Sequence, residues 1–134
     1  MSAERAVYLD SSAIASSLLS ESQSRPRYAD TSVRKRPLLT SALARTGSRS
    51  GLLPAGPEAV SRGFDVLRRI DVVRLNDRIL NAAGTMLPAD LRSLDAIHLA
   101  TAHAVGSDLG RICAHDERLA AAAKASGLAV VAPT

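Results

Sequence analysis

Three aspartates of this chain stand at comparable places, each beside the expected start of a helix. Asp10 follows the apolar residues 6–9, and Asp116 follows a short apolar run that ends at Ala114. Asp95 lies near the head of a helical pattern. In an open parallel sheet, the junctions between strands and helices gather at the carboxyl ends of the strands, where such folds place their sites. We therefore expect three carboxylates that are distant in sequence to converge in space.

Short apolar segments alternate with helical patterns, which is typical of a parallel α/β sheet. We expect strands at residues 6–9, 37–40, 71–75, 111–114 and 128–132. Helices are expected at residues 12–19, 26–33, 57–69, 76–87, 94–105 and 116–126, with residues 41–50 as a poor helix because of Thr46-Gly47-Ser48. The prediction is an α/β fold whose central parallel sheet of four to five short strands is flanked by helices.

The length of 134 residues fits one domain, which we expect to span residues 1–134. Cys113 is the only cysteine, so no internal disulfide can form, and its apolar surroundings predict a buried strand residue. Charged residues near the N-terminus interrupt any signal-peptide pattern, and no run of about 18 apolar residues exists. We therefore expect a soluble, cytoplasmic protein.

The positive charge of the chain is concentrated in one segment, the basic tract of residues 22–57. The formal net charge is +4, and within the tract the only acid is Asp30. The bases there are Arg25, Arg27, Arg34, Lys35, Arg36, Arg45 and Arg49. The tract is either a solvated face or a contact for the phosphate backbone of RNA or DNA. With aromatics making up only 2% of the chain, nucleic-acid contacts should be electrostatic rather than stacking contacts.

Converging carboxylates repel one another unless a hard cation such as Mg²⁺ or Mn²⁺ neutralises them. Asp95 is expected near the second position of its helix, where backbone N–H groups and the helix dipole favour the ionised form. Aspartate is also a common helix cap, so any one of the three has a purely structural alternative. Three at one sheet edge favour a metal site.

Four segments, taken together in this order and spacing, resemble the PIN-domain signature of VapC-type toxins. They are Val7-Tyr8-Leu9-Asp10-Ser11-Ser12-Ala13, Leu39-Thr40-Ser41-Ala42-Leu43-Ala44-Arg45, Leu91-Arg92-Ser93-Leu94-Asp95-Ala96-Ile97-His98-Leu99-Ala100-Thr101-Ala102 and His115-Asp116-Glu117-Arg118-Leu119. The resemblance implies a Mg²⁺- or Mn²⁺-dependent endoribonuclease that acts on RNA, usually dimeric and held inactive by a VapB-type antitoxin. It also implies that Asp10, Asp95 and Asp116 are catalytic and bind the metal.

The chain departs from this family at one acidic position. The family pattern carries a fourth acid, a Glu in the helix after the second strand, and this chain has Gly47 there. Glycine offers no ligand atom and costs roughly 1 kcal/mol relative to alanine inside a helix. On sequence alone, Gly47 benefits neither local structure nor chemistry, and we expect an impaired ribonuclease with an intact fold.

Serine and histidine residues near the aspartates are further candidates. Ser11, Ser12 and Ser41 are placed to bond the carboxylates or a phosphate, and helix capping by Ser11 or Ser12 is the alternative. His98, three residues after Asp95, is either a metal ligand or, as we favour, a packed helix residue. The absence of a Cys/His cluster disfavours zinc.

Three competing functions were weighed against the ribonuclease. A receiver-type phosphoacceptor requires adjacent acids after the first strand, and a phosphatase of the haloacid type requires Asp-x-Asp; residues 10–12 read Asp-Ser-Ser instead. The remaining rival is a PIN-fold protein that binds antitoxin or RNA without cleaving it, and Gly47 keeps that reading open.

Overall fold

The computed structural model describes residues 5–14 and 37–131, and its centre is a five-stranded sheet in which every pairing is parallel. The strand order is β3-β2-β1-β4-β5. The strands are β1 (Ala6–Leu9), β2 (Leu38–Ser41), β3 (Asp71–Val73), β4 (Leu109–Cys113) and β5 (Val130–Val131). The predicted α/β class and the parallel sheet are confirmed.

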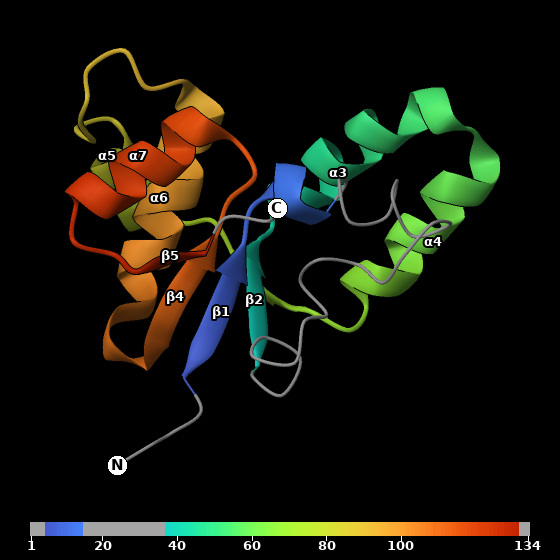
Figure 1. Ribbon diagram of the computed structural model, residues 1–134, viewed down its shortest axis with the longest axis horizontal. Coiled ribbons are helices and arrows are strands. Elements are labelled where there is room, and N and C mark those ends of the chain that lie inside the picture. Colours follow the sequence, from blue (N-terminus) through green and yellow to red (C-terminus); the bar gives the residue numbers. More distant parts are fainter. Residues whose placement is uncertain (1–4, 15–36, 132–134) are drawn as a thin grey trace.

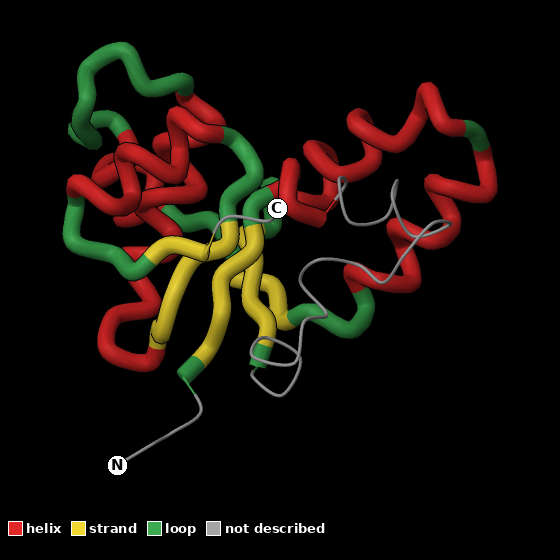
Figure 2. Tube along the Cα trace, in the orientation of Figure 1, coloured by secondary structure: helices red, strands yellow, loops and turns green. Residues whose placement is uncertain are grey.

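Helices pack on both faces of the sheet. Figure 1 shows α5, α6 and α7 on one side and the pair α3 and α4 on the other, and Figure 2 shows the same layers. Residues 11–14 are also helical. The helices are α3 (Ala44–Leu52), α4 (Pro57–Leu67), α5 (Asp77–Ala83), α6 (Ser93–Val105) and α7 (Glu117–Ala125), with short 3₁₀ turns η2 (Leu53–Ala55) and η3 (Gly106–Asp108). Of the helices described, none has the length and apolarity to cross a membrane.

Strand β1 supplies side chains to two cores, because alternate residues of a strand face opposite sides of the sheet. Val7 and Leu9 pack with the helical pair α3 and α4, together with Cys113 of β4. Tyr8 points the other way and packs against α6 and α7. All four β1 residues are buried, which explains why this strand reads as a continuous apolar run. Cys113 is buried as predicted.

Several element boundaries differ from the sequence-based expectations. The poor helix predicted at 41–50 is the regular helix α3, which begins at Ala44, continues to Leu52 and is followed directly by η2. Helix α5 stops at Ala83, where Gly84 caps it, rather than near residue 87. The predicted helix at 26–33 and most of that at 12–19 lie outside the described residues, as do residues 22–36 of the basic tract.

Gly47 has a structural role that sequence reasoning missed. An ideal Cβ on this residue would stand 2.5 Å from Ser11 Oγ and 2.8 Å from Ser11 Cβ, closer than non-bonded atoms approach. Only glycine therefore lets α3 lie this close to the turn that follows β1. The expectation that Gly47 benefits nothing locally is wrong, because the close approach of Ser11 leaves no room for a Cβ at this position.

Candidate active site

The carboxyl ends of the central strands carry two of the three aspartates. Asp10 directly follows β1, and Asp116 follows β4, its neighbour in the sheet. The strand order reverses direction between β1 and β4, and such a switch point opens a crevice at the carboxyl edge of an open sheet. Asp95, in the first turn of α6, feels the charge of Asp116, and Asp10 feels that of Asp95. Asp95 therefore lies within electrostatic range of both other carboxylates, although among the described residues the three do not form a close group.

Asp10 is the most buried of the three acids, with 2% of its surface exposed. Its two carboxylate oxygens accept hydrogen bonds of 2.7 Å from the backbone N–H of Ala13 and from the hydroxyl of Ser12. Burial raises the pKa of Asp10 to about 6, these hydrogen bonds act against that rise, and the charge of Asp95 adds to it. Asp10 itself, and not Ser11 or Ser12, caps the helix that begins at residue 11.

Asp95 carries an unsatisfied acceptor. Its Oδ2 is buried and has no hydrogen-bond partner among the described residues. Burial raises the pKa of this carboxyl and the charge of Asp116 adds to the effect, while Arg92 and Arg118 oppose it. The helix dipole of α6 alone would favour the charged form, but burial and the charge of Asp116 shift the pKa in the opposite direction. The helix also begins one residue earlier than expected, with Arg92 and not Ser93 at the cap position.

Asp116 is the N-cap of α7. Its Oδ1 accepts hydrogen bonds from the backbone N–H groups of Arg118 at 2.7 Å and Leu119 at 3.4 Å. This is the structural role that any single aspartate at a helix start had as its alternative. The capping bonds use only Oδ1, so the role does not exclude a second function for the other oxygen.

The serines and His98 form contacts that the sequence only partly anticipated. Ser12 bonds the Asp10 carboxylate as expected, whereas Ser41 Oγ accepts from the backbone N–H of Leu43. His98 is buried, with Nδ1 2.6 Å from Tyr8 Oη and Nε2 3.0 Å from Ser11 Oγ. Both ring nitrogens are therefore engaged within the protein, which agrees with the favoured reading of a packed residue. Neither contact partner had been identified from the sequence.

We call the region of Asp10, Asp95 and Asp116 the acidic cleft. A divalent cation fits this region chemically, although the side chains do not form a ready-made cage. Among residues 5–14 and 37–131, no group of three or more His, Cys, Asp or Glu side chains is close enough to hold an ion. The buried, unpartnered Asp95 Oδ2 is nevertheless an oxygen acceptor without a donor, next to other carboxylates whose charges repel it. Oxygen donors of this kind suit Mg²⁺ or Mn²⁺.

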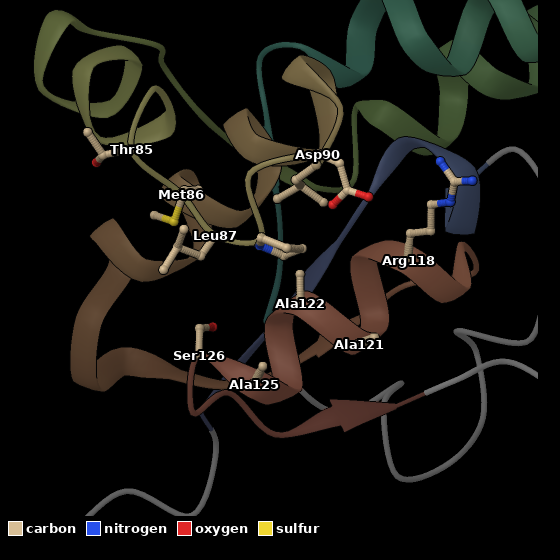
Figure 3. Close-up of a pocket in the computed structure, with 11 residues that line it drawn as sticks. Thr85, Met86, Leu87, Asp90, Arg118, Ala121, Ala122, Ala125 and Ser126 are labelled. Atoms are coloured by element: carbon tan, nitrogen blue, oxygen red, sulfur yellow. The ribbon is translucent and has the colours of Figure 1, made fainter.

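A pocket of about 840 Å³ lies beside the acidic cleft. Figure 3 shows it between the loop after α5, which contributes Met86 and Leu87, and the face of α7 that carries Ala122 and Ala125. The lining includes Arg118, whose charge also acts on Asp95, but none of the three aspartates. The pocket is therefore a neighbour of the acidic cleft and not the cleft itself.

Comparison with known proteins identifies relatives over nearly the whole chain. The family model described as "PIN domain" matches residues 7–127. "Ribonuclease VapC46" of Mycobacterium tuberculosis strain H37Rv is 46% identical over 131 residues, which cover 96% of this chain and 98% of that protein. "Ribonuclease VapC47" of the same species, strain CDC 1551, is 30% identical over 131 residues, covering 95% of this chain and 96% of the relative.

Two solved structures have a similar fold. One is Mycobacterium tuberculosis VapC20, described as a Sarcin-Ricin loop cleaving toxin, with a TM-score of 0.67, 17% identity, and coverage of 91% of this chain and 95% of that one. The other is a toxin–antitoxin complex from Klebsiella pneumoniae, with a TM-score of 0.66, 18% identity, and coverage of 96% and 98%. At these identities the likeness concerns the fold alone.

Proposed function

The chain belongs to the PIN-domain family and, within it, to the VapC-type ribonuclease toxins, and on that premise we propose that it is a metal-dependent endoribonuclease whose acidic residues are Asp10, Asp95 and Asp116. The observation that carries the proposal is the buried, unpartnered Oδ2 of Asp95, electrostatically coupled to the other two carboxylates. The substrate is RNA, and the reaction is hydrolysis of a phosphodiester bond.

Each carboxylate has a distinct part in this proposal. Asp10 and Asp95 hold the cation, Mg²⁺ or Mn²⁺, and Asp116 binds a second cation or orients water. A divalent cation supplies Lewis-acid stabilisation of the phosphate and lowers the pKa of bound water. Ser12 fixes the Asp10 carboxylate through its 2.7 Å hydrogen bond, and Arg92 and Arg118 place positive charge near Asp95. These arginines are suited to contact phosphate oxygens.

Activity of the chain as it stands is impaired in this proposal. Gly47 provides no carboxylate where the family pattern has its fourth acid, so the cleft has less negative charge and one oxygen ligand fewer. A cation then binds less tightly and is less well placed, and a misplacement of about 1 Å can cost on the order of a hundredfold in rate. The alternative function, which Gly47 favours, is a PIN-fold protein that binds antitoxin or RNA without cleavage.

The partners follow from the family. A VapB-type antitoxin neutralises the protein, and the functional form is a homodimer in the cytoplasm. The Klebsiella structure of similar fold is a complex of toxin and antitoxin, which supports the first of these partners.

The direct test combines Mn²⁺ binding and RNA cleavage in one set of variants. Titration calorimetry is expected to detect Mn²⁺ binding that Asp95→Asn and Asp10→Asn abolish, and a slow cleavage of structured RNA that needs the metal. Asp65→Asn is the matched control, because Asp65 is an exposed acid paired with Arg68 on α4. Unchanged Mn²⁺ binding in both site variants would refute the site assignment. Binding without any cleavage would favour the silent alternative.

A further inference from the structure

One buried histidine joins the two elements that carry Asp10 and Asp95. His98 lies on α6, one turn after Asp95, and contacts Tyr8 through Nδ1 and Ser11 through Nε2. Tyr8 and Ser11 lie on either side of Asp10 in the sequence. A single imidazole thus connects the end of β1 to α6, and it does so between two carboxylates whose charges repel each other.

The two contacts of His98 reach different parts of the chain: Tyr8 lies within a paired strand, and Ser11 lies in the turn after that strand. Tyr8 belongs to β1, which is paired with β2 on one side and β4 on the other, so its position does not depend on the imidazole. Ser11 lies beyond the strand end, in the turn that carries Asp10. Ser11 Oγ is enclosed between His98 Nε2 at 3.0 Å and the open side of Gly47. The bond from Nε2 is therefore the one that fixes the turn.

The Tyr8 contact selects the tautomer of the neutral imidazole, that is, which of its two nitrogens carries the hydrogen. A phenol keeps its hydrogen at neutral pH, and burial lowers the pKa of His98 to about 4, so the ring is neutral. A neutral imidazole has one donor nitrogen and one acceptor nitrogen. If the phenol donates to Nδ1 across 2.6 Å, Nε2 carries the hydrogen and donates to Ser11 Oγ.

We propose that His98 is a positioning residue of the acidic cleft: held by Tyr8 as the Nε2–H tautomer, it donates to Ser11 Oγ and so keeps the Asp10 turn against the helix of Asp95. Ser11 accepts this bond and keeps its own hydroxyl hydrogen for a group in the cleft. The metal-binding part of this inference rests on the proposed function. Partners that orient ligand side chains in this indirect way typically change metal affinity by about 10- to 100-fold.

Two conservative variants separate the two bonds of His98. The amide of Gln reaches the place of Nε2 and retains the contact with Ser11, whereas the amide of Asn reaches the place of Nδ1 and retains the contact with Tyr8. His98→Gln is expected to keep the Mn²⁺ dissociation constant within about threefold of the parent, and His98→Asn to weaken it about tenfold or more. A purely structural histidine would predict no such difference between folded variants.

The control is a second histidine on the same helix. His103 Nε2 lies 2.8 Å from Ser126 Oγ, so His103→Asn removes another histidine–serine contact made from α6 and, as the match to His98→Asn, should leave Mn²⁺ affinity unchanged. If His98→Asn does not fold, Ser11→Ala replaces it and is expected to weaken Mn²⁺ binding to a similar degree. Equal affinity in the parent, His98→Asn and Ser11→Ala would overturn the proposal, as would an equal loss in His98→Gln and His98→Asn.

A metal-free measurement keeps this test separate from the proposed function. Nitrogen-15 NMR of the histidine rings should show Nε2 of His98 protonated and Nδ1 unprotonated, and the carbon-13 signal of the Asp10 carboxyl should move in His98→Asn but not in His98→Gln. The opposite tautomer, or an unmoved Asp10 signal, would overturn the inference. A parent protein without Mn²⁺ affinity would contradict the proposed metal site, and the NMR result would still decide the role of His98.

Discussion

Ser11 Oγ lies only 2.5 Å from the point where a side-chain carbon on residue 47 would stand, so Gly47 and Ser11 occupy what is in effect one site. Any substitution at position 47 must displace Ser11, and through it the bond to His98. A glutamate there would add a carboxylate to the cleft and at the same time disturb the turn that holds Asp10. The steric and the electrostatic effects therefore have to be measured separately.

The first prediction concerns the steric effect. Gly47→Ala should lower the free energy of unfolding by up to about 2 kcal/mol, because overpacking costs about 1–3 kcal/mol and the better helix propensity of alanine returns about 1 kcal/mol. Urea unfolding followed by circular dichroism measures the difference. A stability equal to or above that of the parent would show that the Ser11 turn yields without cost.

Gly47→Glu should be compared with Gly47→Ala, because both carry the same displaced Cβ and differ by the carboxylate. The glutamate variant is expected to bind Mn²⁺ more tightly and to cleave RNA faster than the alanine variant, since it adds an oxygen ligand to the cleft. A cleavage time course on one structured RNA, with Asp95→Asn as the blank, measures the effect. Equal rates would show that a fourth acid is dispensable in this chain.

A second prediction follows from the pKa of His98, which burial lowers from 6.5 to about 4. The unfolded chain binds this proton more readily, so the contribution of His98 to stability is present above pH 6.5 and is lost as the pH falls towards 4. The full effect is about 3 kcal/mol at roughly 1.4 kcal/mol per pH unit. Asp10 acts in the opposite sense: its pKa of about 6 adds relative stability as the pH falls from 6 towards 3.8.

The pH dependences of stability that His98 and Asp10 contribute therefore offset each other in the parent, so a variant that lacks one group should show the pH dependence of the other. In metal-free buffer, the parent should show a shallow dependence of stability on pH between 4 and 6.5, whereas His98→Gln should gain stability as the pH falls. Urea midpoints at half-unit pH steps check this, and Asp10→Asn should show the reverse trend. Parallel curves for the parent and His98→Gln would mean that His98 titrates normally in the folded protein.

The third prediction concerns the basic tract, whose sequence contains seven basic residues and one acidic residue. If the tract contacts RNA phosphates, Arg25→Gln with Arg27→Gln should reduce the slope of log affinity against log salt by roughly 1.4, at about 0.7 per single-strand contact. Arg62→Gln with Arg69→Gln, at exposed positions outside the tract, is the matched control. An unaltered slope would identify the tract as a solvated face or an antitoxin surface.

The fourth prediction concerns the antitoxin. Co-expression with the small protein encoded beside this gene should give a stable complex that survives size-exclusion chromatography. Gly47 is only partly exposed, and most of an antitoxin interface must lie elsewhere, so Gly47→Ala should co-purify as well as the parent. Failure of any neighbour-encoded protein to co-purify would count against a toxin–antitoxin role.

Local sequence patterns predict the elements whose conformation is set locally. The four buried residues of β1 form one apolar run, and the end of α7 is marked by Gly127, with a φ of 98° that favours glycine. Helix α3 could not be predicted well, because its propensity is poor and its stability comes from burial of Ala44 and Leu52 in the core.

In the candidate site, too, the features set by local sequence could be predicted, and the contacts between distant residues could not. The three aspartates could be proposed because each follows or begins a regular element, and the sheet topology places Asp10 and Asp116 at the ends of neighbouring strands. The role of His98 could not, because its partners Tyr8 and Ser11 are 90 and 87 residues away in sequence and no local pattern encodes the contact. The direction of the Asp95 pKa was also missed, since burial and Asp116 outweigh the helix dipole only in the folded protein.

Cys113, the only cysteine of the chain, gives the protein a built-in reporter of opening. It lies opposite Leu9 where β1 pairs with β4, and burial raises the pKa of its thiol to about 12, with a further contribution from Asp10. Because alkylating reagents attack the thiolate, they can modify this residue only when the core between the sheet and the helices α3 and α4 opens. The alkylation rate in the unlabelled, unmutated protein therefore measures how often the helical layer beside the Asp10 strand opens.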